Sequence, residues 1–184
     1  MIHRDLKVRR SHQLIKCTLI GLLTVLILIC KPSNILVNAN CDIALTDFGL
    51  SRGLSGGAKE DLTEYVVTRN YRSPELLCDS SRYGKSVDIW SVGCIFLEII
   101  CRKRSLFIGK SPFHQLASII ETVGCPPCDE LDFVEHPVIR DMITTSRNKV
   151  KQGEDPLRRM LPNNVEPEAL DLLKKMLVVK PEDR

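Results

Sequence analysis

Residues 86–100 constrain the fold of this chain more than any other part of the sequence. Their Val, Ile, Leu, Phe and Trp side chains would cover nearly every side of a helix. A helix that is apolar all round is a buried one, so these residues predict a central helix enclosed by other elements. A chain of 184 residues, 43% apolar and 27% charged, is long enough to bury one such core.

Two further helices are indicated by their first residues. Ser111 as N-cap, followed by Pro112, predicts a helix that stops at Gly124. Pro167 opens another, in which apolar residues keep helical spacing up to the next proline. Residues 125–164 are polar without periodicity, so we expect loops there.

A β-hairpin is predicted before the central helix. Residues 35–37 form a short apolar run, residues 38–40 supply turn chemistry, and apolar positions alternate over residues 42–46. Residues 50–64, rich in Gly, Ser and charged side chains, predict a surface loop. The expected fold class is therefore mainly α with one small hairpin.

The excess positive charge of the chain lies in one place. The net charge of +3 is too small to indicate a nucleic-acid partner. Residues 8–31 hold four basic side chains and no acidic one, together with the only long apolar run, at residues 17–30. Composition therefore changes abruptly at both ends of this segment, which we call the insertion.

The eight cysteines are scattered along a chain too large to need disulfide staples, which favours free thiols. Cys125 and Cys128 have the CxxC spacing of zinc and redox sites. Because a structural zinc site normally needs four ligands and no second pair exists, we interpret these two as loop cysteines.

Four short motifs follow one another along the chain. Residues 3–7 read HRDLK and residues 31–34 read KPSN, so that without the residues between them they spell HRDLKPSN. DFG stands at residues 47–49 and SPE at residues 73–75. In this order the motifs resemble those of the protein kinase family. The resemblance implies the larger, helical lobe of a kinase domain over residues 1–184, with the smaller lobe absent.

The resemblance implies a role for each motif residue. Asp5 matches the aspartate that accepts the substrate hydroxyl proton, and Lys7 or Lys31 matches the lysine that neutralises the moving phosphoryl group. Asn34 and Asp47 match the ligands of magnesium, so ATP and Mg²⁺ are the implied cofactors. Phosphoryl transfer builds charge on oxygens, which cations held by carboxylate and amide oxygens stabilise.

Residues 63–69 read TEYVVTR and resemble the activation lip of MAP kinases of the extracellular-signal-regulated type. The resemblance implies that an upstream dual-specificity kinase phosphorylates Thr63 and Tyr65. A phosphate orders a loop where guanidinium groups await it. Four arginines match such partners: Arg4 and Arg52 for Thr63, and Arg69 and Arg72 for Tyr65. The implied substrates are proteins modified at Ser or Thr, before Pro.

Other residues match the supporting framework of the family. Asp88 matches the aspartate that holds the backbone of the HRD turn, and Thr68 matches the threonine that bonds the catalytic aspartate and lysine. Glu75 and Arg184 match a buried ion pair that ties the lip to the last helices. Asn70 departs from the pattern, because these kinases usually carry tryptophan there, and this leaves the proline preference open.

The insertion is the largest departure from the family pattern. It separates Asp5 from Asn34 by 29 positions, where the family has five. Reacting groups misplaced by about 1 Å can lose about a hundredfold in rate. No glycine-rich loop or strand lysine is present to hold ATP. We therefore expect this chain alone to be nearly inactive.

Two origins for the insertion are open. Removing residues 8–31 restores an uninterrupted motif, and the codons of Val8 and Arg9 can encode a splice-donor-like sequence, so one interpretation of the insertion is a translated intron. Alternatively, residues 14–30, with Leu14 at one end and Cys30 at the other, anchor the chain in a membrane. We disfavour the anchor, because a span would put Asp5 and Asn34 on opposite sides of a bilayer.

The function expected from the sequence is thus that of a MAP-kinase-like serine/threonine kinase, located in the cytoplasm, the nucleus or both. A pseudokinase that serves as a docking module is the alternative from a different class, beside the membrane-anchored protein. Partners of a kinase would be its protein substrates and the upstream kinase.

Overall fold

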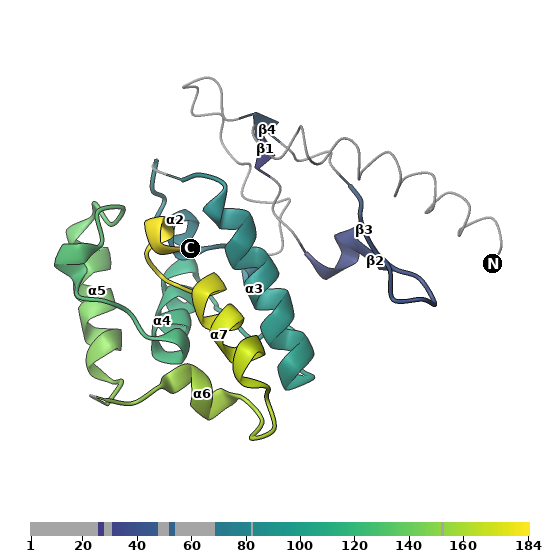
Figure 1. Cartoon of the computed structure of the whole chain (residues 1–184). Coiled ribbons are helices and arrows are strands. Elements are labelled where there is room, and N and C mark those ends of the chain that lie inside the picture. The colour runs from purple at the N-terminus through teal and green to yellow at the C-terminus, as the bar shows by residue number, and fades with distance from the viewer. Residues whose placement is uncertain (1–25, 28–30, 48–51, 54–68, 82, 152) are drawn as a thin grey trace.

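The computed structural model describes residues 26–27, 31–47, 52–53, 69–81, 83–151 and 153–184. Within these residues the helices form one body, and a small hairpin lies beside it (Figure 1). The elements are β1 (Leu26–Ile27), the 3-10 turn η1 (Pro32–Asn34), β2 (Ile35–Val37), β3 (Ile43–Leu45), β4 (Arg52–Gly53), η3 (Arg69–Tyr71), α2 (Pro74–Leu77), α3 (Ser86–Cys101), α4 (Pro112–Val123), η4 (Cys128–Glu130), α5 (Pro137–Asn148), α6 (Pro156–Met160), α7 (Pro167–Met176) and η5 (Pro181–Asp183).

The central helix predicted from residues 86–100 is α3, and it packs against α7, η3 and η5. A Cβ atom on Gly93 would lie 2.9 Å from Leu177 Cδ2 and 3.0 Å from Met176 Cβ. Only glycine therefore lets α3 approach the end of α7 this closely. The prediction of burial on every side is wrong at one face, where Ile89 and Ile99 are exposed.

The helices predicted from capping residues are confirmed as α4 and α7. The Ser111 hydroxyl accepts a hydrogen bond from the His114 backbone N–H at 3.1 Å, as an N-cap does. Helix α4 stops before Gly124, whose φ of 81° is accessible to glycine at little cost. Helix α7 begins at Pro167, as its sequence predicts.

The predicted hairpin is formed by β2 and β3, which are antiparallel and pair Ile35 with Leu45. Its turn is closed by the Asn38 side chain, whose Oδ1 accepts from the backbone N–H groups of Asn40 and Asp42, each at 2.9 Å. Ile35 and Leu45 pack against the helical core. The hairpin is thereby held to the helices at the end away from its turn.

Strands β1 and β4 form a second, two-residue ladder that the sequence did not predict. Leu26 lies opposite Gly53, and Ile27 lies opposite Arg52. Since Leu26 and Ile27 belong to the insertion, part of the insertion pairs with the residues that follow the DFG motif.

The prediction of loops over residues 125–164 is wrong, because η4, α5 and α6 lie there. Helix α5 buries only Ile139, Ile143 and Ser146, on one narrow stripe. Apart from Pro137 and Met142, its other positions are polar or β-branched, so the apolar periodicity is weak. Packing against α4 stabilises a helix whose sequence gives little indication of it.

The core lies between α3, α4, α5 and α7. Its largest fully buried side chains come from all four helices and from the loops between them: Trp90, Leu97, Phe107, Leu116, Ile119, Ile120, Leu131, Ile143 and Leu173. None of the helices within the described ranges is both long and apolar enough to cross a membrane. The run at residues 14–30 lies outside those ranges except for β1.

Candidate functional site

Asn34 lies directly before β2 and Asp47 lies two residues after β3, so both stand at the same end of the hairpin. Asn34 closes η1, where its backbone N–H donates to Lys31 O at 2.9 Å, and its side chain is 5% exposed. The Thr46 backbone N–H donates to Asn34 O at 2.9 Å. Asp47 follows Thr46 directly, so a residue with an amide and a residue with a carboxylate stand at the end of the hairpin away from its turn.

Asp47 has a strained backbone and an exposed side chain. Its φ of 61° lies in the left-handed region, which a residue other than glycine seldom adopts. Such strain is retained where the surroundings fix the backbone, and it often marks a functional position. The carboxylate is exposed at the start of the DFG motif.

The donor set at this end of the hairpin suits a hard cation. Asn34 offers an amide oxygen, contacted only by Ser33 Oγ at 3.4 Å, and Asp47 offers a carboxylate. Within the described ranges no group of three or more His, Cys, Asp or Glu side chains could hold a metal ion. Two protein oxygens, completed by water and phosphate, are what Mg²⁺ commonly takes at nucleotide sites.

Several predicted site residues lie outside the described residues. These are Arg4, Asp5, Lys7, Thr63, Tyr65 and Thr68. Lys31 precedes η1 and is half-buried. Arg52 lies in β4, opposite Ile27. Asp88 lies in the first turn of α3, half-buried.

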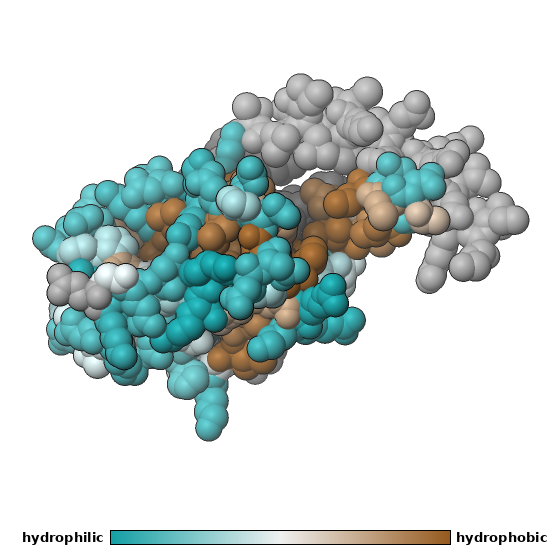
Figure 2. Space-filling view, turned by 60° about the horizontal axis from the view of Figure 1, so that its bottom comes forward, coloured by the Kyte–Doolittle hydropathy of each residue, from teal (hydrophilic) through white to brown (hydrophobic). Residues whose placement is uncertain are grey.

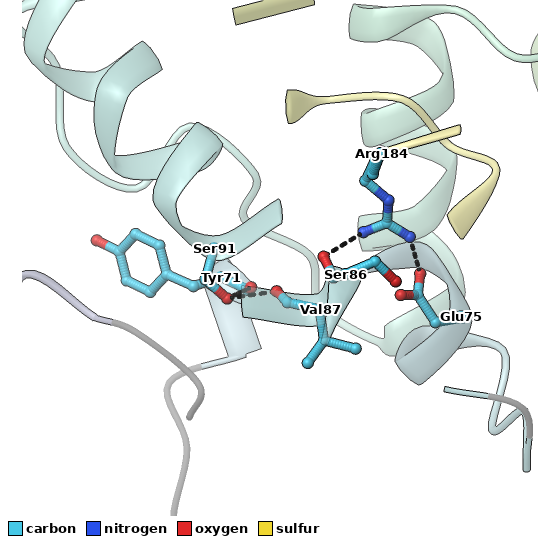
Figure 3. Close-up of polar contacts among 6 residues, drawn as sticks. All are labelled: Tyr71, Glu75, Ser86, Val87, Ser91 and Arg184. Atoms are coloured by element: carbon cyan, nitrogen blue, oxygen red, sulfur yellow. Dashed lines mark hydrogen bonds and ion pairs between the residues drawn. The ribbon is translucent and has the colours of Figure 1, made fainter. Parts of the chain in front are cut away.

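The structure brings Glu75 and Arg184 together. Arg184 Nη2 lies 2.5 Å from Glu75 Oε2, and both side chains are 0% exposed. The same guanidinium donates from Nη1 to Ser86 O at 3.2 Å (Figure 3). Its centre lies 5.3 Å from the centroid of the Trp90 ring. The last residue of the chain is thereby tied to α2 and to both the start and the core of α3.

Arg69 begins η3, the turn at the end of the predicted lip, and Arg72 follows this turn directly. Arg69 is exposed and Arg72 is half-buried. Arg69 O accepts from the Arg72 backbone N–H at 3.0 Å and from Gln115 Nε2 at 2.6 Å. Gln115 is 1% exposed on α4, so a buried amide fixes the start of this turn.

Tyr71 at the end of η3 is held by α3. Ser91 Oγ donates to Tyr71 O at 3.0 Å (Figure 3), and the Tyr71 hydroxyl donates to Glu98 Oε2 at 3.2 Å. The Ser105 backbone N–H donates to the other Glu98 oxygen at 2.7 Å. Burial, followed by the charge of Glu98, raises the pKa of Tyr71 from 10.0 to about 12.

These anchors of η3 were missed in the sequence. Gln115, Ser91 and Glu98 are polar residues inside otherwise apolar helices, and that contrast is the signal that could have found them. Buried polar groups are normally hydrogen-bonded, so each one indicates a partner nearby. The sequence does not say which carbonyl or hydroxyl that partner is.

The CxxC cysteines are separately engaged. Cys128 Sγ lies 3.4 Å from Arg140 O and 3.3 Å from Thr144 Oγ1 on α5. Cys125 packs against the core, and burial raises the pKa of its thiol to about 12. Both are free thiols, and neither is bonded to the other.

Comparison with known proteins gives consistent matches. The model of the "Protein kinase domain" family matches residues 29–184. Mitogen-activated protein kinase 13 of Arabidopsis thaliana is 47% identical over 154 residues, which are 84% of this chain and 40% of that protein. Mitogen-activated protein kinase 5 of Oryza sativa subsp. indica is 45% identical over the same shares of each chain.

A solved structure agrees with these relatives. A Map kinase from Leishmania major, solved in a complex, has a TM-score of 0.61 and 34% identity, over 85% of this chain and 45% of that one. The chain spans about 40% of the length of the curated relatives that it matches. The match to the family model begins at residue 29, inside the insertion.

Proposed function

The chain belongs to the protein kinase family, and from that premise we propose that it is part of a MAP-kinase-like enzyme that transfers the γ-phosphate of ATP to Ser or Thr hydroxyls of proteins. One observation carries the proposal: the Asn34 amide and the Asp47 carboxylate lie at the same end of the β2–β3 hairpin, joined by the bond from Thr46 to Asn34. This placement of both residues that the family pattern assigns to the cation supports the proposal.

Mg²⁺ with ATP supplies the transferable phosphoryl group and neutralises its charge when bound. Asn34 and Asp47 hold the cation in this proposal, and Lys7 or Lys31 faces the phosphoryl oxygens. Asp5 accepts the proton of the attacking hydroxyl. Each residue positions or neutralises, which is how phosphoryl transfer is catalysed in this family.

Activation is proposed to depend on phosphorylation of Thr63 and Tyr65 by an upstream dual-specificity kinase. Arg69 and Arg72 stand at η3, directly after the lip, and their guanidinium groups suit a phosphate on Tyr65. Arg4 and Arg52 would receive the phosphate on Thr63. Asn70 in η3 stands where the family usually has tryptophan, so the preference for proline after the target is the least supported part.

A test of the cation site can use the hairpin itself. Mn²⁺ with ATP should broaden the Asn34 side-chain amide signals in NMR spectra of the 184-residue chain, because a paramagnetic ion relaxes nearby nuclei. Asp47→Asn should remove the broadening. Asp42→Asn is the matched control, since Asp42 is an exposed aspartate at the other end of the same hairpin. Equal broadening in both variants would refute the site.

A second candidate function, a docking module without turnover, is favoured by the β1–β4 ladder. The strand that leads into Lys31 comes from the apolar insertion, not from residues 3–5. In the family pattern the proton acceptor stands five positions before the residue that Asn34 matches. Ile29 stands at that position in this sequence, so no acid occupies the place of the proton acceptor there.

Transcript sequencing separates the two candidates. We propose that residues 8–31 are a translated intron, so mature messages should lack them. If all messages keep the insertion, the docking module is the better interpretation. A complementary assay uses the purified chain: radioactive phosphate transfer that Asp5→Asn abolishes would contradict its expected inactivity.

A further inference from the structure

A large hollow among the described residues lies far along the chain from the hairpin and plays no part in the proposed function. It is a groove of about 1010 Å³ between the ends of α4, α5 and α7 and the start of α6. Ligand sites commonly measure roughly 300–1,000 Å³, so this groove has room for more than a small metabolite. Its walls include Val123, Cys125, Arg147, Lys151, Lys174 and Val178.

The acidic side chains of the groove are already neutralised. Asp155 Oδ2 lies 2.5 Å from Lys174 Nζ, and both residues line the groove. Glu154 Oε1 lies 2.8 Å from Arg159 Nη1, which approaches from α6. Neither carboxylate is therefore left to attract a cationic ligand.

Two cations of the groove remain for a ligand. Arg147 and Lys151 stand four residues apart at the end of α5, and both are exposed. Arg147 uses its Nε to donate to Cys125 O at 3.1 Å, which leaves the two terminal nitrogens of the guanidinium. In the described part of the chain no ion pair or hydrogen bond engages the Lys151 ammonium. The groove thus offers two positive charges at one rim.

The rest of the surface is apolar or accepts hydrogen bonds. Val123, Val150 and Val178 line the groove as half-buried side chains. Helices α4, α5 and α7 all end there. Cap N–H groups bond some of their last carbonyls, such as Ile120 O, Arg147 O and Leu173 O, and the other carbonyls of a last helical turn lack intrahelical donors. Such carbonyls suit the backbone N–H groups of an extended chain better than a compact ion.

We propose that this groove binds an extended peptide segment of a partner protein in which acidic residues alternate with aliphatic ones. The carboxylates would pair with Arg147 and Lys151, the aliphatic side chains would contact the valines, and the peptide N–H groups would meet the helix ends. Charge complementarity selects this occupant over a basic segment. The proposal needs no catalytic residue, so it stands whichever function the chain has.

The test measures binding of a probe peptide to the 184-residue chain. The probe is a fluorescein-labelled, amidated Glu-Val-Glu-Leu-Glu-Val peptide, followed by fluorescence anisotropy. Charge reversal in Arg147→Glu/Lys151→Glu should weaken binding by about tenfold or more, because two carboxylates at the rim would then repel those of the probe. The matched control is Arg102→Glu/Arg104→Glu, which makes the same charge change at exposed positions after α3 that do not line the groove.

Each outcome decides the proposal. Loss of binding in the groove variant alone supports it, whereas equal loss in both variants shows unspecific attraction and overturns it. Binding of the Lys-Val-Lys-Leu-Lys-Val peptide as tightly as the acidic probe also overturns it. If loss of the Arg147 contact to Cys125 O unfolds the double variant, Lys151→Glu alone replaces it, and wild-type affinity in that variant rejects the proposal.

Discussion

The two faces of α3 differ although their side chains are alike. Trp90 and Leu97 are 0% exposed, whereas Ile89 is 42% and Ile99 67% exposed. Hydropathy would bury both faces equally. What differs is the neighbour: α7, η3 and η5 cover one face. Burial therefore depends on which element can approach, and Gly93 shows how closely α7 does.

Apolar side chains are exposed on the β2–β3 hairpin as well as on α3. The β2–β3 hairpin exposes Leu36, Val37 and Ile43, and Figure 2 shows hydrophobic surface on the hairpin side of the molecule that extends toward the helices. Where exposed apolar surface is contiguous, it usually marks a contact with another element or another chain. The covered and uncovered faces should accordingly respond differently to the same substitutions.

The largest loss of stability is expected at the buried ion pair between Glu75 and Arg184, which lies at the start of α3. Arg184→Met should lower the free energy of unfolding by about 3–5 kcal/mol, because it leaves Glu75 buried without its partner. Urea denaturation followed by circular dichroism measures the loss. The double variant Glu75→Leu/Arg184→Met should recover much of it, because no buried charge is then left. A loss below about 1 kcal/mol in the single variant would show that Glu75 finds another partner.

Truncating one residue on each face of α3 compares the covered face with the exposed face most directly. Leu97→Ala should cost about 2–5 kcal/mol, since it opens a cavity in the core. Ile99→Ala removes a similar volume from the exposed face and should change stability by no more than about 0.5 kcal/mol. The same urea titration serves both. Equal losses would mean that the Ile99 face is covered in solution.

How far the sequence predicts this fold can be seen helix by helix. Helix α4 is predicted because Ser111, Pro112 and Gly124 mark its ends by local chemistry that needs no partner. Helix α5 is not, because only Ile139 and Ile143 mark its apolar stripe and α4 supplies the rest of its stability. Capping residues can be recognised in the sequence alone, whereas the packing of one helix against another cannot.

The same division holds in the candidate site. The placement of Asn34 before one hairpin strand and of Asp47 after the other follows from the hairpin pattern and the motif order. The bonds from Gln115 to Arg69 O and from Tyr71 to Glu98 join residues 46 and 27 positions apart, and no pattern in the sequence pairs them. Long-range contacts of this kind depend on how the helices pack, which is why they came only from the structure.

A pH titration tests the covered face through Tyr71. The unfolded tyrosine loses its proton near pH 10, but the folded one keeps it to about pH 12, so stability should fall as pH rises between these values. Tyr71→Phe should fall less steeply from pH 10 to 12, after a loss of about 1 kcal/mol at pH 7 for the bond to Glu98. Cys78, whose pKa burial raises to about 12, contributes to the slope in both proteins. Identical slopes would contradict the assignment.

The smallest change in the free energy of unfolding is expected on the outer surface of α7. It shows how little an exposed ion pair contributes beside the buried pair of Glu75 and Arg184. Lys175 Nζ lies 2.7 Å from Asp171 Oδ2, and the two side chains are 72% and 64% exposed. Water screens such a pair, so Lys175→Ala should change the free energy of unfolding by about 0.3–0.5 kcal/mol at low salt and by less at about 1 M salt. Replicate urea titrations at both salt concentrations measure the difference. An effect as large as that of Arg184→Met would mean that burial does not separate the two ion pairs, because these pairs have similar distances and differ chiefly in exposure.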